Sequence, residues 1–220
     1  GTTDIAVFYK GILRHAAVIP YGGFIITQDI RKGCSILHRH AEQLKVQYGS
    51  SLSDTAPSNK VVTLPSVIGN NTKEISFKSL ASIIQARMSE ILAAVNFEIE
   101  NSEVAHKLDG GVVLTGGGSM LKDLTHLVNY ELSMDARVGK PRVSIKESLD
   151  KDLTLPIYST SVGLLLKGLG SGGEHAIELS PAQEEETNGQ AAASRKKGGQ
   201  FIRKLKNVLS DFFDEQDADM

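Results

Sequence analysis

The sequence predicts a mixed α/β (α+β) domain followed by a flexible linker and a C-terminal amphipathic helix. Three observations support it: a β-hairpin pattern over residues 5–19, helical periodicity at residues 36–48 and 80–99, and an apolar run at residues 112–114 that enters a helix through three glycines. An apolar run without polar alternation is typical of a strand covered on both faces in a parallel sheet. The domain is therefore expected to contain strands and covering helices.

The composition is typical of a globular protein. Of the 220 residues, 40% are hydrophobic and 23% are charged, which is enough for a sizeable core in one or two domains plus tails. The net charge of -2 gives no general attraction to nucleic acid, so no nucleic-acid partner is expected. The single cysteine, Cys34, excludes an intrachain disulfide and suits a reducing cytosol. Nothing in the sequence resembles a membrane span or a signal peptide, and the chain begins with Gly1, as a fragment would.

The glycines after residues 112–114 are the strongest candidate for a nucleotide site. Gly116, Gly117 and Gly118 lack a Cβ, so they can adopt positive φ and let the backbone lie against a flat ligand or a phosphate. Ser119 is expected to cap the helix that follows. A tight turn without a ligand is the alternative, and an isolated glycine triplet does not decide between the two.

Two further motifs could contribute to such a site. The Gly1-Thr2-Thr3 run precedes a strand and could bind phosphate oxygens through N–H and hydroxyl groups, although such a run can also be a simple hairpin edge. Glu42 and Lys45 lie three residues apart on the helix at 36–48, which predicts a solvated salt bridge worth a few tenths of a kcal/mol.

The chain changes composition abruptly after residue 170. Residues 171–198 contain almost no large apolar side chains and should form a disordered linker, while residues 199–213 regain helical periodicity and residues 214–220 form an acidic tail. The helix places seven large apolar side chains on one arc, with two lysines at its edges whose stems can lie along an apolar surface. This pattern favours a membrane-surface anchor over docking on the chain's own domain. The anchor residues are Phe201, Ile202, Lys204, Leu205, Lys206, Val208, Leu209, Phe212 and Phe213.

Together these motifs resemble the actin-like ATPase superfamily and, within it, the bacterial cell-division FtsA family. Residues 1–23 look like the end of the second phosphate loop and the sequence after it, residues 41–45 (AEQLK) are similar to the helix that contacts the adenosine, and residues 110–121 resemble the adenosine motif. Residues 155–169 look like the second connecting helix, and residues 201–213 look like the membrane-targeting helix.

This resemblance implies the second lobe of an actin-like, RNase H-like fold. Its mixed five-stranded sheet would belong to a nucleotide-binding subdomain at residues 1–35 and 103–170, and residues 36–102 would form an inserted small subdomain. The first lobe, which holds the other phosphate loop and most of the magnesium-positioning residues, is expected outside this chain. The chain would then contain about half of a site for ATP and Mg²⁺.

By the same resemblance, Gly1, Thr2 and Thr3 would contact phosphates, Glu42 the ribose hydroxyls, Lys45 the adenine face, and Gly116 to Ser119 the nucleoside. No catalytic residue or protein metal ligand is assigned, because the implied role is that of an ATP-binding cytoskeletal adaptor with at most weak ATPase activity. Such a protein tethers the FtsZ ring to the cytoplasmic face of the bacterial inner membrane at the division septum and helps to assemble the divisome.

The implied partners are the FtsZ C-terminal tail, a lipid surface, copies of the protein in actin-like filaments, and other divisome proteins. The FtsZ tail would bind the segment at residues 36–102, where Arg87 is expected on the solvated face of the long helix and could meet an acidic peptide. An actin-fold ATPase or kinase and a pilus-assembly scaffold are the alternatives. The ATPase or kinase has no evident use for the C-terminal amphipathic helix, and the pilus-assembly scaffold would be expected to lack it.

The tail helix yields a test of the membrane-anchor prediction. Leu209→Glu should abolish binding to liposomes, because it places a charge on an arc where each buried apolar side chain contributes on the order of 1 kcal/mol or more. The measurement is co-sedimentation with vesicles. If a chain that ends at Gly198 sediments as well as the full chain, the anchor prediction is wrong.

Overall fold

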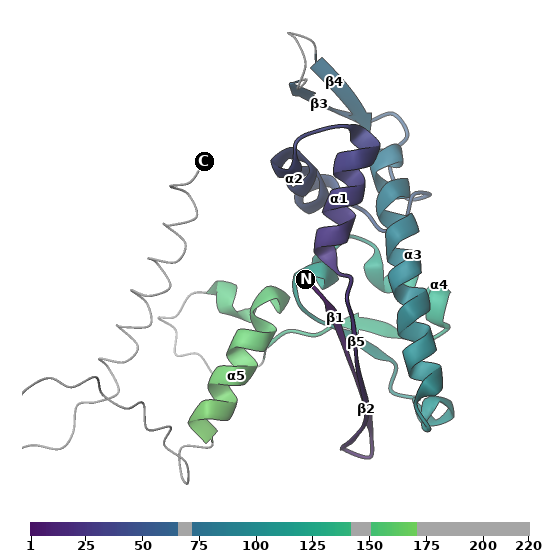
Figure 1. Cartoon of the computed structure of the whole chain (residues 1–220), viewed down its shortest axis with the longest axis vertical. Helices are drawn as coiled ribbons and strands as arrows, with labels where there is room; N and C mark the ends of the chain where they lie inside the picture. Colours follow the sequence, from purple (N-terminus) through teal and green to yellow (C-terminus); the bar gives the residue numbers. More distant parts are fainter. Residues whose placement is uncertain (66–71, 142–150, 171–220) are drawn as a thin grey trace, which may run out of the picture. The chain divides into compact units, whose positions relative to one another are not determined.

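The computed structural model describes residues 1–65, 72–141 and 151–170 (Figure 1). The chain divides into two units, Gly1–His175 and Ala176–Met220, and all described residues belong to the first unit. The predicted linker at 171–198, the amphipathic helix at 199–213 and the acidic tail at 214–220 lie outside the described residues. Among the helices that are described, none is long and apolar enough to cross a membrane.

The first unit alternates strands and helices. Its strands are β1 (Thr3–Tyr9), β2 (Ile12–Ile19), β3 (Val61–Pro65), β4 (Thr72–Ser76), β5 (Val112–Leu114) and β6 (Ala136–Val138). Its α-helices are α1 (Gly23–Cys34), α2 (His38–Tyr48), α3 (Phe77–Asn101), α4 (Leu124–Leu132) and α5 (Ser159–Gly170). Four short 3-10 turns complete the order: η1 (Ala105–Lys107), η2 (Gly117–Met120), η3 (Lys151–Thr154) and η4 (Pro156–Tyr158).

The predicted hairpin at residues 5–19 is confirmed as β1 and β2. Its two-residue turn consists of Lys10 (φ 52°) and Gly11 (φ 76°), and two positive φ angles are what a tight turn needs to match the right-handed twist of paired strands. Val7 and Ile19 on the inner face are 5% and 6% exposed, and both strands contact α3. The hairpin is therefore fixed to the long helix along one face.

Helix α3 supplies the centre of the core. It begins at Ser76, whose hydroxyl accepts a hydrogen bond from the Ser79 N–H (3.0 Å), and this bond caps the helix N-terminus. The predicted apolar stripe is confirmed, since its buried residues recur at intervals of three and four. The buried residues of α3 are Leu80, Ala81, Ile84, Met88, Ile91, Leu92 and Ile99. Helices α1, α2 and α4 all pack against α3 (Figure 1).

The described strands form three separate two-stranded sheets, so the predicted five-stranded sheet is not seen among them. β1–β2 and β3–β4 are antiparallel, whereas β5–β6 is parallel as the apolar run at 112–114 predicted. The expectation that this run is covered on both faces was wrong. Val112 and Leu114 pack against the core, but Val113 on the opposite face is 50% exposed because the three-residue strand meets the core along one face only.

The core includes residues from both proposed subdomains. Helices α1 and α4 come from the segments assigned to the nucleotide-binding subdomain, while α2, β4 and α3 come from residues 36–102, and their buried side chains form one cluster. The boundaries of the two subdomains stay a prediction. Cys34 is buried in this cluster, as expected for a small apolar side chain without a disulfide partner.

Candidate functional site

A pocket of about 980 Å³ brings together five of the residues that the sequence indicated for nucleotide contacts. Gly1, Glu42, Lys45, Gly117 and Gly118 all line it. The other lining residues come from α1, α2, the loop after α2, the start of α3, and the segments around η2 and η4. They include Phe24, His38, Tyr48, Lys60, Phe77, Met120, Leu121, Lys122, Ile157 and Tyr158.

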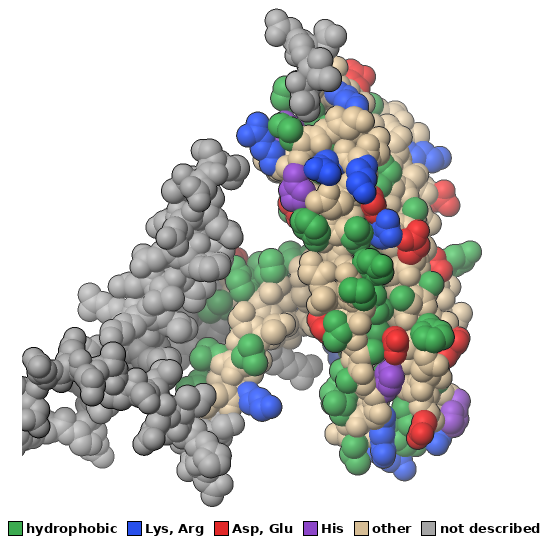
Figure 2. Space-filling model, viewed as in Figure 1, with side chains coloured by type: hydrophobic (Ala, Val, Ile, Leu, Met, Phe, Trp, Pro, Cys, Tyr) green, Lys and Arg blue, Asp and Glu red, His purple; other side chains and the backbone are tan. Residues whose placement is uncertain are grey.

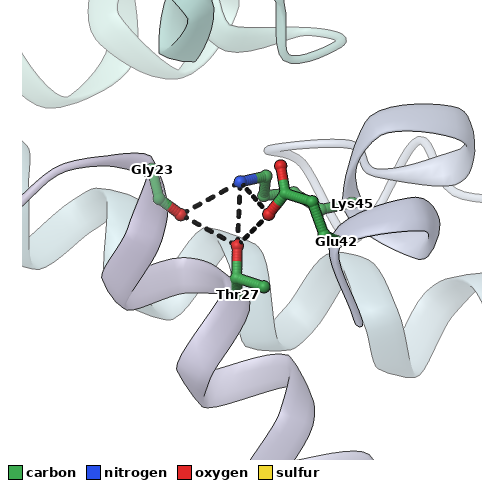
Figure 3. A network of polar contacts seen from close by, with 4 residues as sticks. All are labelled: Gly23, Thr27, Glu42 and Lys45. Atoms are coloured by element: carbon green, nitrogen blue, oxygen red, sulfur yellow. Dashed lines mark hydrogen bonds and ion pairs between the residues drawn. The ribbon is translucent and has the colours of Figure 1, made fainter. Parts of the chain in front are cut away.

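One wall of the pocket is held by a network of polar contacts around Lys45 (Figure 3). The Lys45 ammonium group donates hydrogen bonds to Gly23 O (3.1 Å), Thr27 Oγ1 (2.8 Å) and Glu42 Oε2 (2.8 Å), which engages all three of its N–H groups. Thr27 is fully buried, and its hydroxyl lies 2.5 Å from the same Glu42 oxygen. The network ties α2 to the first turn of α1.

This arrangement corrects the expectation of a solvated salt bridge. The Lys45 side chain is only 13% exposed, because it turns inward to a threonine and a backbone carbonyl that lie 18 and 22 residues away in sequence. The Glu42 side chain is 44% exposed. Figure 3 shows its second oxygen, Oε1, turned away from the network, and no described residue donates a hydrogen bond to it.

The charge state of Glu42 follows from the network. Burial raises the pKa of Glu42, but hydrogen bonds from Lys45 and Thr27 and the positive charge of Lys45 together lower it by more, so its pKa lies below the ordinary value. Glu42 is therefore ionised at neutral pH. Its carboxylate presents a hydrogen-bond acceptor at the pocket while Lys45 holds it in place.

The start of the chain lies close to the first turn of α1. A Cβ at Gly22 would lie 2.9 Å from Thr2 O and 3.0 Å from Gly1 O, so only a glycine permits this approach of the two backbones. Of the three predicted phosphate contacts, Gly1 lines the pocket, whereas Thr2 and Thr3 are not among its described lining residues. The Thr3 hydroxyl donates to Tyr21 O (2.8 Å), and the Thr2 hydroxyl donates to Asp4 (3.1 Å).

The glycine turn forms a second wall of the pocket. Gly116 has a φ of 84°, as predicted for this triplet, and its N–H donates to Pro156 O (3.0 Å). Gly117 and Gly118 have ordinary φ and begin η2. A Cβ at Gly117 would make only a normal contact with Ile157 (3.7 Å), and one at Gly118 would meet nothing within 4 Å. Space for a ligand therefore lies beside these two glycines.

The expectation that Ser119 caps the next helix was wrong. Its hydroxyl donates back to Gly116 O (2.8 Å) inside the 3-10 turn, so Ser119 is buried and is not among the described residues that line the pocket. The helix begins later, at Leu124, and its N-cap residue is Asp123. The insertion of η2 explains the difference, because a 3-10 turn already satisfies the hydroxyl before the α-helix starts.

Sequence patterns did not reveal the aromatic part of the pocket. The rings of Phe24 and His38 lie 5.6 Å apart, and those of Tyr48 and Phe77 lie 5.3 Å apart. These side chains come from separate segments, so their convergence leaves no local signal. Apolar and aromatic side chains beside an acceptor carboxylate suit a ligand with a flat ring and hydroxyl groups. The described residues contain no group of three side chains that could hold a metal ion.

Arg87 differs from its predicted environment. Its Nε donates to Asp29 of α1 (2.5 Å), its Nη1 donates to Glu90 (2.5 Å), and its side chain is 27% exposed. The hydrogen bond to Asp29 is the main cause that raises the pKa of Arg87. Arg87 therefore joins α1 to α3 and is not a free cation for an acidic peptide.

The described residues have an actin-like fold, as comparison with solved structures shows. Two crystal structures of MreB5 from Spiroplasma citri share this fold: the one bound to ADP has a TM-score of 0.57 at 20% identity, and the one bound to AMPPNP has 0.56 at 18%. Each match covers 78% of this chain and 53% of the MreB5 chain.

The chain belongs to the FtsA family, because the family model for cell division protein FtsA matches residues 1–163. Cell division protein FtsA of Pseudomonas aeruginosa is 37% identical over 169 residues, which are 77% of this chain and 40% of that protein. Its namesake in Neisseria meningitidis is 33% identical over 214 residues, which are 97% of this chain and 49% of that protein. The predicted family is confirmed, and the chain spans about half the length of its curated relatives.

The Lys45 network makes stability depend on pH in a defined direction. Because the pKa of Glu42 is lowered in the folded protein, the ionised carboxylate stabilises the folded state at pH values above 4.5, the ordinary pKa of glutamate. This contribution is lost as the pH falls through the folded-state pKa. Glu42→Gln should therefore be less stable than the wild type at pH 7, and the difference should shrink between about pH 6 and pH 3. Urea unfolding followed by circular dichroism at several pH values measures it.

Glu90→Gln is the matched control, since Glu90 also pairs with a cation three residues away but its side chain is 66% exposed. Its effect on the free energy of unfolding should be small at every pH, because exposed ion pairs contribute little. A Glu42→Gln difference that stays constant or grows on acidification would show that the network does not hold an ionised Glu42.

Proposed function

We propose that this chain provides one half of an ATP site in an FtsA-type adaptor, which tethers the FtsZ ring to the cytoplasmic face of the bacterial inner membrane. The observation that carries the nucleotide half of the proposal is the convergence of Glu42, Lys45, Gly117, Gly118 and Gly1 on one pocket. These residues come from segments up to about a hundred residues apart, and they are the positions indicated by the family motifs.

The two walls of the pocket suit an adenosine. The free Oε1 of Glu42 can accept hydrogen bonds from ribose hydroxyls, because only Oε2 is engaged by Lys45 and Thr27. Gly117 and Gly118 leave space for a flat base, and Met120 and Ile157 offer apolar contacts to it. The ammonium group of Lys45 already makes three hydrogen bonds, so we assign it the role of orienting Glu42, while its side chain lines the site.

ATP would act as a conformational ligand. A nucleotide held between this chain and a first lobe stabilises the arrangement of the lobes that it binds more tightly, and hydrolysis is then at most secondary. Mg²⁺ would be positioned mainly by residues of that first lobe. The two MreB5 structures share the fold and are bound to ADP and AMPPNP, which supports nucleotide binding by a domain of this kind.

Membrane and FtsZ binding would reside in different parts of the chain. We assign lipid contact to the amphipathic sequence at residues 199–213 and the FtsZ C-terminal tail to residues 36–102, with self-association and other divisome contacts as further expected properties. Figure 2 shows Lys and Arg side chains over the end of the molecule that carries α2, β3 and β4. Exposed cations in this segment suit an acidic peptide, and Lys78 at the start of α3 is one of them.

The nucleotide proposal predicts weak binding by the isolated chain, with a dissociation constant of about 1 mM or more, because one lobe supplies about half of the contacts. Addition of ATP to about 10 mM should shift the amide resonances of Gly117, Gly118 and Gly23 in ¹H–¹⁵N correlation spectra. Gly118→Val should reduce these shifts, because the new side chain enters open space beside the glycine turn.

Gly110→Val is the control for this substitution, because its Cβ also meets nothing within 4 Å and Gly110 is not among the described lining residues. It should leave the ATP response unchanged. Shifts that are spread over the hairpin β1–β2 instead of the pocket, or a Gly118→Val chain that responds like the wild type, would contradict the proposed site.

The FtsZ assignment requires a surface substitution, because deletion of residues 36–102 would remove α2, β4 and α3 from the core. Lys78→Glu should lower co-sedimentation with FtsZ polymers severalfold, since it reverses an exposed positive charge in the segment assigned to the FtsZ tail. Lys10→Glu in the turn between β1 and β2, an exposed lysine outside this segment, should leave co-sedimentation unchanged. Equal losses with both variants would indicate a non-specific charge effect and remove support for the assignment.

A further inference from the structure

Hydroxyl and backbone hydrogen bonds join the loop after α2 to the turn that follows the glycines. Ser50 and Thr55 donate through their hydroxyls to the same oxygen of Asp123, at 2.9 Å and 3.0 Å. Ser51 donates to Lys122 O through its N–H (2.9 Å) and through its hydroxyl (2.6 Å). We call these five residues the Asp123 seam. It connects segments that lie about seventy residues apart in sequence.

Ser50 and Ser51, two residues of the seam, are buried. Ser50 is 5% exposed and Ser51 is fully buried, so their hydroxyls need acceptors inside the protein. The hydroxyls of Ser50 and Thr55 also lie 3.2 Å and 3.1 Å from Leu52 O, but the carboxylate is nearer in each case and carries a charge. A charged acceptor makes the stronger hydrogen bond, so Asp123 is the main partner.

The side chain of Asp123 takes part in the seam and does not cap the helix that begins after it. An aspartate at a helix N-cap normally has extended backbone and accepts a hydrogen bond from the first turn. Asp123 is the N-cap residue of α4, but it has a left-handed conformation (φ 61°) and its side chain makes no cap hydrogen bond. Aspartate adopts this backbone conformation more readily than most residues other than glycine. The Asp123 carboxylate instead accepts hydrogen bonds from the loop after α2.

The seam lies where the two walls of the pocket meet. Ser50 and Lys122 both line the pocket. Ser50 directly follows Gly49, which ends the helix that carries Glu42 and Lys45, and Asp123 follows the turn that contains Gly117 and Gly118. A change in the seam therefore changes the separation between the carboxylate wall and the glycine wall.

We infer that Asp123 is a positioning residue, which sets the placement of the glycine turn against α2 and thereby the width of the pocket. The inference rests on the proposed function only in that the pocket is taken to bind a nucleotide. The positioning itself is independent of any ligand, so it can be measured on the chain alone.

The test compares Asp123→Gly, which removes the carboxylate while glycine keeps the left-handed backbone, with Asp123→Asn, which retains one acceptor oxygen. Native-state hydrogen exchange of the Ser51 amide reports the seam, because this N–H is bonded to Lys122 O. Asp123→Gly should accelerate it by about tenfold or more, as expected for a lost hydrogen bond to a charged group, and should shift the Gly118 amide resonance. Asp123→Asn should have a smaller effect of the same kind. The exchange rate of the buried Ile84 amide monitors global unfolding.

Asp29→Asn is the matched control, because it breaks a charged contact between α1 and α3 away from the seam. It should not accelerate Ser51 exchange more than Ile84 exchange. Titration with ATP at millimolar concentration completes the test: Asp123→Gly should weaken the response of the glycine-turn amides at least about threefold, and Asp29→Asn should not.

The possible outcomes distinguish the positioning role of Asp123 from nucleotide binding by the pocket. If Ser51 exchange and the Gly118 resonance are unchanged in Asp123→Gly, Asp123 does not position the turn. If both change but the wild-type ATP response persists in the variant, the seam is merely structural and the inference is overturned. If the wild-type chain shows no ATP response at all, the proposed function fails, whereas faster Ser51 exchange with a shifted Gly118 resonance still supports the positioning role.

Discussion

The rest of the structure depends on the apolar stripe of α3. Helices α1, α2 and α4, the hairpin β1–β2 and strand β4 all contact this helix. Fully buried side chains such as Leu80 and Ile84 can be accommodated only if these elements cover the stripe together. The position of α1 against α2 fixes Thr27 and Gly23 beside Lys45, and the position of α4 fixes Asp123. Burial of one helix face therefore determines where the polar groups of the pocket lie.

The two walls of the pocket are built differently, one by a side-chain network and the other by a glycine turn. Its carboxylate wall is fixed by a buried lysine whose three donors are all used within the protein, and one oxygen of Glu42 has no hydrogen-bond donor among the described residues. Its glycine wall contains the positive φ of Gly116, and the Asp123 seam links the following turn to the loop after α2. Such separation of ligand-facing groups from the groups that orient them is typical of preorganised sites.

Local patterns predicted much of the fold and part of the site. The hairpin was predictable because Gly11 lies between two strand patterns, and α3 because its apolar residues keep helical spacing over the whole element. The positions of Glu42, Lys45, Gly117 and Gly118 on one pocket followed from family motifs. Each of these signals is contained in a short stretch of sequence.

Other features depend on contacts between distant residues and could not be predicted in this way. The i, i+3 spacing of Glu42 and Lys45 is the same for a solvated pair and for a buried one, and only Thr27 and Gly23 of α1 decide between them. The environment of Arg87 depends on Asp29, which is 58 residues away. The hydroxyl of Ser119 donates to Gly116 O within a 3-10 turn, which the sequence pattern did not indicate. The exposure of Val113 likewise depends on which faces of a three-residue strand are covered.

The long sequence separation across the Asp123 seam has a consequence for the order of folding. The hairpin β1–β2 forms by contacts that are local in sequence, whereas Ser50 must meet Asp123 across 73 residues. Closure of a long loop costs chain entropy before its contacts are gained, so such contacts tend to form late and to open first. We expect the two walls of the pocket to come together in the last stage of folding. They can also separate in a local opening that leaves the core around α3 intact.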